Sequence, residues 1–115
     1  MTMLRLFLRA TSYAATAMIA VLALLPGRLN VDVTGTAEVK HATAYAGTAF
    51  LLVVAHQRWV APTLFLFIYA AVLEYAQHWS PGRHPLVAHF LASSMGAVVG
   101  AGIAWTVLST RWVRS

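Results

Sequence analysis

Four long apolar segments, separated by short polar stretches, most constrain the fold of this chain. They cover about residues 4–25, 41–56, 59–79 and 85–109. An α-helix needs about 17 to 25 mostly apolar residues to cross the hydrocarbon core of a bilayer, and each segment is close to that length. The sequence therefore predicts an all-α polytopic membrane protein in which four transmembrane helices form an antiparallel bundle.

The composition also favours the membrane class. Of the 115 residues, 60% are hydrophobic and only 10% are charged, whereas an ordinary soluble domain carries about 25% charged residues. A soluble chain of this length could not bury so much apolar surface, because the exposed fraction rises as domains become smaller. The length predicts a single domain, 1–115, and the absence of cysteine excludes disulfides, thiolate metal sites and cysteine nucleophiles.

Prolines and glycines mark the ends of the segments. Pro26-Gly27 follows the first segment, and Pro81-Gly82 follows the third. Pro62 and Pro85 fall in first turns, where the missing N–H costs little. The first segment also resembles a signal peptide, but no convincing cleavage site follows it, so we expect a retained helix. Residues 28–40 are polar, and we expect a loop or a short extended piece there.

The net charge of +5 bears on partners and on topology. The eight Lys and Arg residues lie near segment ends and form no basic stripe, so we expect no nucleic-acid partner. Four spans place both termini on one side, which then holds five of the basic residues against three on the other. Cytoplasmic loops are enriched in Lys and Arg, so we expect a multi-pass protein of the bacterial inner membrane with both termini in the cytoplasm. The five are Arg5, Arg9, Arg58, Arg111 and Arg114, and the three are Arg28, Lys40 and Arg83.

Polar residues of three segments are expected to meet at one depth. Glu74 and Gln77 lie at the end of the third segment, on one helix face because their spacing is i, i+3. In the predicted topology this end lies level with the starts of the second and fourth segments. The residues that converge there are His41, Tyr45, Glu74, Gln77, Arg83 and His89.

The chemistry expected of this group centres on Glu74. A charged side chain at the bilayer centre costs about 2.5–3.5 kcal/mol, so this carboxylate should face inward and hold a partner, with Arg83 or His41 the candidates. We expect Glu74 and His41 to be the catalytic groups, with Glu74 binding or transferring a proton. The alternative is that these groups only lock the helices together. The residues expected to bind a ligand are Arg83, Gln77, Tyr45 and His89.

Two other chemistries are weighed and not adopted. Glu74 and His78 are spaced i, i+4 and could ligate a metal ion together with histidines of the neighbouring segments. No His-Glu-x-x-His pattern is present, however, so we expect no metal and no other cofactor. A serine nucleophile at Ser93 or Ser94 lacks an elbow motif. Whether the protein is an enzyme stays open.

The order of these motifs resembles that of the VanZ-like family of small bacterial membrane proteins. The matching motifs are His41-Ala-Thr-Ala-Tyr45, Glu74-x-x-Gln77, Pro81-Gly82-Arg83 and Gly96-Ala-Val-Val-Gly100. The resemblance covers about residues 38–104, and this chain departs from it at His89 and Ser93, where the family usually has Asp and Asn. It implies an envelope-related membrane role in a family named after a protein that lowers susceptibility to a glycopeptide antibiotic.

Two functions follow as hypotheses. In the first, an outward-facing polar pocket acts on or binds the anionic head group of an envelope lipid or cell-wall precursor. In the alternative, the chain is a non-enzymatic helper subunit. Gly96 and Gly100 form a small-residue face for close helix packing, and that face would dock onto a larger membrane complex or a second copy.

Overall fold

A computed structural model describes residues 3–24, 37–76, 79 and 87–114 of the chain. These residues form four α-helices and no strand. The helices are α1 (Met3–Leu24), α2 (Ala37–His56), α3 (Val60–Ala76) and α4 (Val87–Arg114). The prediction of an all-α chain with four helices is therefore confirmed.

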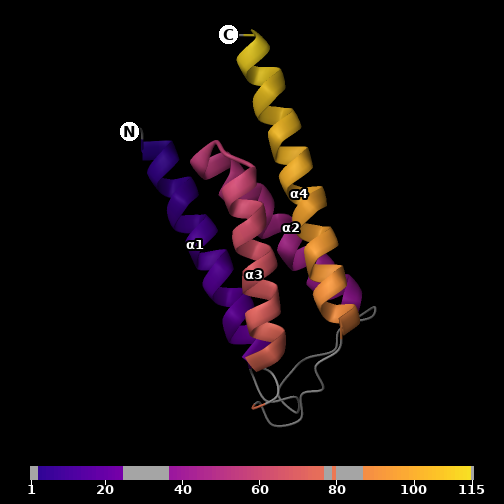
Figure 1. Cartoon of the computed structure of the whole chain (residues 1–115). Coiled ribbons are helices and arrows are strands. Elements are labelled where there is room, and N and C mark those ends of the chain that lie inside the picture. Colours follow the sequence, from indigo (N-terminus) through magenta and orange to yellow (C-terminus); the bar gives the residue numbers. More distant parts are fainter. Residues whose placement is uncertain (1–2, 25–36, 77–78, 80–86, 115) are drawn as a thin grey trace.

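Successive helices run in opposite directions along the bundle (Figure 1). The start of α1, the turn from α2 to α3 and the end of α4 lie at one end, which we call the termini end. The end of α1, the start of α2, the end of α3 and the start of α4 lie at the other, which we call the distal end. As a consequence α2 and α4 run parallel to each other.

The helix ends differ from the apolar segments that predicted them. α2 begins at Ala37 rather than at residue 41, and α4 continues to Arg114 rather than ending near residue 109. Hydropathy shows where apolar residues stop, but Lys and Arg are good helix formers and the backbone continues through them. α3 ends at Ala76, before residue 79. Of the loop expected at residues 28–40, residues 28–36 lie outside the described residues, whereas 37–40 form the first turn of α2, so the prediction of a loop is wrong there.

A tight turn joins α2 to α3. Gln57 adopts a left-handed backbone conformation with a φ of 57°. Its N–H donates a hydrogen bond to the carbonyl oxygen of Val53 at 2.7 Å, which caps the last turn of α2. On the far side, the hydroxyl of Thr63 donates to the carbonyl oxygen of Trp59 at 2.6 Å. This short connection makes α2 and α3 antiparallel.

α2 is the central helix of the bundle, and its closest partner is α4. Ala49, Val53 and Ala55 of α2 are fully buried. Gly96 and Gly100 of α4 lie directly against the α2 backbone, at Ala42 and Ala46 respectively. The small-residue face that the sequence predicts is thus used for packing, and the helix that it packs against belongs to the same chain.

Large apolar side chains cover the outward faces of the other three helices. On α3, Ile68 is 65% exposed and Val72 57%. Soluble monomers rarely expose contiguous apolar patches larger than a few hundred Å². Further exposed side chains include Leu4, Phe7, Met18 and Leu22 on α1, Leu64 and Phe65 on α3, and Leu91, Met95, Val98 and Ile103 on α4.

One helical stretch within the described residues, His89–Thr110, is long and apolar enough by length and composition to cross a membrane. Val60–Ala76 is apolar but shorter than the 18 residues required for such a span. The membrane prediction therefore has support from one helix.

Candidate functional site

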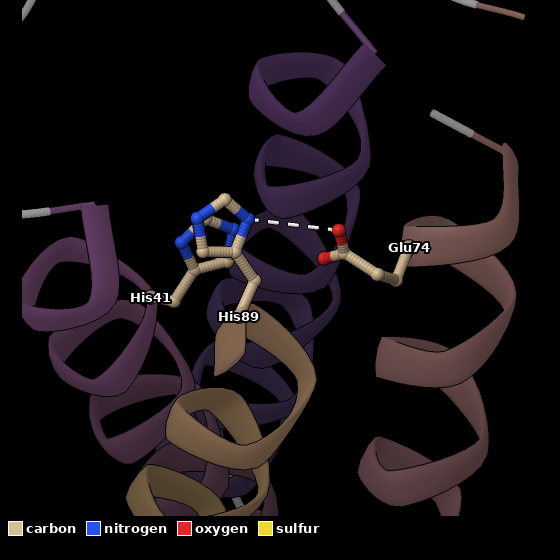
Figure 2. A group of neighbouring side chains, drawn as sticks. All are labelled: His41, Glu74 and His89. Carbon is tan, nitrogen blue, oxygen red and sulfur yellow. Dashed lines mark ion pairs between the residues drawn. The ribbon is translucent and has the colours of Figure 1, made fainter. Parts of the chain in front are cut away.

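Three helices bring His41, Glu74 and His89 together at the distal end. His41 lies in the second turn of α2, Glu74 in the last turn of α3 and His89 in the first turn of α4. Figure 2 shows the two imidazoles side by side, with the carboxylate reaching towards them from α3. We call these three residues the distal cluster. They come from parts of the sequence that lie far apart, and the alternating helix directions place them at one level.

The geometry of the distal cluster is close. The rings of His41 and His89 are stacked, with centroids 4.7 Å apart and planes 12° from parallel. Nδ1 of His89 lies 3.5 Å from Oε2 of Glu74, and each of these two side chains is 14% exposed. Glu74 thus faces the interior, where His89 is one of its neighbours. Sequence reasoning had named His41 and Arg83 as its candidate partners.

A second polar pair lies one helical turn deeper. Tyr45 follows His41 by four residues on α2, and Ser93 follows His89 by four residues on α4. Both side chains are 2% exposed, and they share a hydrogen bond. Because α2 and α4 are parallel and in contact, equal steps along the two helices keep the residues paired. Ser93 was not among the predicted site residues. The signal that could have found it was this shared i, i+4 spacing.

The remaining predicted site residues cannot be placed in the same way. Gln77 and Arg83 lie outside the described residues, as do His78 and His84. Arg83 belongs to the segment that joins α3 to α4, and both helix ends of that segment are at the distal end. Its predicted role in binding stays a prediction.

The distal cluster also contains an unsatisfied polar atom. Nδ1 of His89 is buried and has no hydrogen-bond partner in the part of the chain that the structure describes. Oε2 of Glu74, at 3.5 Å, is within ion-pair range of this nitrogen but beyond the usual hydrogen-bond distance. Leaving a buried donor or acceptor unpaired costs about 1–3 kcal/mol. Nδ1 of His89 is therefore available to bind a further group.

A different polar pair lies at the termini end. The hydroxyl of Tyr13 on α1 and Nε2 of His56 on α2 are 3.0 Å apart, and Tyr13 is exposed. Tyr13 lies midway along α1, whereas His56 is the last residue of α2. This pair is about a helix length from the distal cluster and forms no part of it.

No protein-family model matches the chain, and comparison with curated proteins and with solved structures finds no match either. The VanZ-like resemblance therefore stays an expectation that rests on the motifs quoted above. The function must be argued from the bundle and the distal cluster.

Proposed function

We propose that this chain is a multi-pass protein of the bacterial inner membrane, of the VanZ-like type, with both termini in the cytoplasm. Its distal end then forms an outward-facing polar site that binds the anionic head group of an envelope lipid or lipid-linked cell-wall precursor. The observation that carries this proposal is the convergence of His41, Glu74 and His89 at one end of an otherwise apolar bundle.

The arrangement of apolar side chains supports the membrane part of the proposal. α2, which carries fewer exposed large apolar side chains, is central, while α1, α3 and α4 present such side chains outward. In water this arrangement would leave a large apolar surface exposed to solvent, which is unfavourable. In a bilayer, lipid tails would cover the same surface. The 20 residues of α2 also give it about 30 Å of length at 1.5 Å per residue, which matches the hydrocarbon thickness.

The absence of cysteine allows this topology to be tested directly. We expect a single cysteine at Val39 to react with a membrane-impermeant maleimide in the periplasm, and one at Arg58 to be protected in intact inner membranes. Val39 is exposed near the start of α2, whereas Arg58 is exposed in the turn at the opposite end. Permeabilised cells provide the control, because both positions should then react. Equal labelling of both positions in intact cells would contradict a spanning α2.

Ionisable groups within membrane segments often mark ligand or proton pathways, which supports the head-group part of the proposal. His41 and His89 offer N–H groups to a phosphate at head-group depth, and the buried Tyr45 lies one helical turn below them. Arg83 adds a permanent cation in the segment that follows α3, and a hydrogen bond to a charged group is worth about 1.5–3 kcal/mol. The distal cluster would then orient the head group while the acyl chains lie against the bundle.

Lipid that co-purifies with the protein tests the binding function. We expect Arg83→Ala to lower the amount of phosphate-bearing lipid retained in detergent by about tenfold, the loss expected for about 1.4 kcal/mol. Glu74→Gln should lower it as well, if the carboxylate orients the neighbouring imidazoles. Arg58→Ala is the matched control, because it removes an arginine at the opposite end of the bundle. Mass spectrometry of the bound lipid gives the readout, and equal retention in all four proteins would refute the site.

The helper-subunit alternative receives less support. It requires the face of Gly96 and Gly100 to be available to a partner, and α2 of the same chain covers that face. A partner would have to dock elsewhere on the bundle.

A further inference from the structure

The distal cluster has the donor set of a metal site. It offers two imidazole nitrogens and one carboxylate oxygen, and the candidate ligand atoms all lie within 4.8 Å of one another. Two imidazoles and a carboxylate around one ion, with a remaining position open, is a ligand set found in zinc enzymes. We propose that His41, Glu74 and His89 bind one divalent transition-metal ion, with Zn²⁺ as the best fit.

The distances need only a small adjustment. Zinc binds imidazole nitrogen at about 2.0–2.1 Å and carboxylate oxygen at about 2.0–2.2 Å. In a tetrahedral site, ligand atoms at those distances lie about 3.3–3.5 Å apart. Nδ1 of His89 and Oε2 of Glu74 already lie 3.5 Å apart. The remaining separations must close by up to about 1.5 Å, and the stacked imidazoles must turn so that both point at one ion. Side-chain rotation can supply both changes without moving the helices.

The unsatisfied nitrogen is a second, independent indication. Nδ1 of His89 is buried without a hydrogen bond among the described residues, although it points towards the carboxylate of Glu74 (Figure 2). The carboxylate oxygen is 3.5 Å away, which is beyond the usual hydrogen-bond distance, so it does not give this nitrogen a hydrogen bond. A cation between the two would bind both atoms and give the imidazole nitrogen a partner.

The chemistry of the donors narrows the choice of ion. Imidazole favours Zn²⁺ and other late first-row ions over Mg²⁺ and Ca²⁺, which prefer oxygen ligands. The chain has no thiolate to select copper(I). Three protein ligands leave a position for water or for an oxygen of another molecule. In the proposed function that position would face a phosphate oxygen, but the metal site itself does not depend on lipid binding.

The sequence expectation of no metal has a clear physical origin. A His-Glu-x-x-His pattern detects ligands that share one helix, whereas these three ligands come from three helices. Alternating helix directions predict that the three residues lie at one level, but only the contact between α2 and α4 brings the two imidazoles side by side.

Metal titration of the full-length protein tests the proposal. The protein is purified in detergent without a histidine tag, stripped with a chelator, and titrated with Zn²⁺ against a chromophoric competitor. We expect one Zn²⁺ per chain, and at least 100-fold weaker binding for His41→Gln, Glu74→Gln and His89→Gln. Glutamine keeps most of the side-chain volume in each case. His56→Gln is the matched control, because it removes a histidine of α2 at the termini end, and it should bind Zn²⁺ as the wild type does.

Two further measurements make the outcome decisive. Co²⁺ in place of Zn²⁺ should give the visible absorption of a four- or five-coordinate ion, and the three ligand variants should lack it. Circular dichroism and size-exclusion chromatography of the metal-free proteins check that each variant folds. Folded variants that bind Zn²⁺ as tightly as the wild type would overturn the proposal, as would equal weakening by His56→Gln. Because no lipid is added, failure here leaves the head-group experiment unaffected, and the reverse also holds.

Discussion

Replacing Gly100 with leucine is expected to prevent the bundle from assembling, and Gly100→Ala alone should destabilise it by about 1–3 kcal/mol. A Cβ at this position would lie 2.7 Å from the carbonyl carbon of Ala46 and 2.8 Å from its Cα. These are backbone atoms of α2, which can move away only if the helix moves. Gly96 has the same relation to Ala42, so Gly96→Ala should act in the same direction.

Gly102→Ala provides the matched control for this prediction. Gly102 lies on the same helix two residues further along, is exposed, and has no neighbouring atom within 4 Å of an added Cβ. Alanine in a helix interior is favoured over glycine by about 0.5–1 kcal/mol, so this variant should be at least as stable as the wild type. Thermal unfolding in detergent, followed by circular dichroism, compares the variants. If Gly100→Ala were as stable as Gly102→Ala, the close contact between α2 and α4 would be wrong.

Ile68→Lys is expected to remove most of the protein from the membrane, whereas in a soluble protein the same substitution should have almost no effect. Ile68 lies midway along α3 and is 65% exposed. In a soluble protein, a lysine at so exposed a position changes stability by less than about 0.5 kcal/mol. Under our proposal the same side chain faces lipid, where a lysine at the helix centre costs about 2.5–3.5 kcal/mol.

Two controls show whether the effect comes from the lysine charge at this depth or from any substitution at this site. Trp59→Lys introduces the same charge one residue before α3, where the side chain can extend into the interface, so membrane insertion should be retained. Ile68→Leu keeps the apolar surface and should behave as the wild type. The fraction that resists carbonate extraction gives the readout. If Ile68→Lys resisted carbonate extraction as the wild type does, the outward apolar face of α3 would not contact lipid.

Much of the fold could be predicted from local properties of the chain. Helix number and approximate limits followed from the lengths of the apolar segments and from Pro26-Gly27 and Pro81-Gly82. The helix limits were less accurate where charged residues continue a helix, as at the start of α2 and the end of α4. Hydropathy indicates which side chains prefer an apolar environment, whereas helix formation depends on backbone hydrogen bonds. An apolar segment and the helix that contains it therefore need not end at the same residue.

The candidate site could be predicted in part. The alternation of helix directions implied that His41, Glu74 and His89 share a level, and the structure brings them together. The stacking of the two imidazoles did not follow from the sequence, nor did the pairing of Tyr45 with Ser93. Both depend on the parallel contact of α2 with α4, and short connections had suggested antiparallel neighbours only.

The amino-acid sequence by itself determined the helical class, the number of helices and the common level of His41, Glu74 and His89. These properties act locally, because segment length and hydropathy need no knowledge of which helix lies beside which. Only the tertiary structure decided that α2 is central and that Gly96 and Gly100 press α4 against its backbone. This packing depends on how the volumes of side chains far apart in the sequence fit together. It also brings His41, Glu74 and His89 into one cluster.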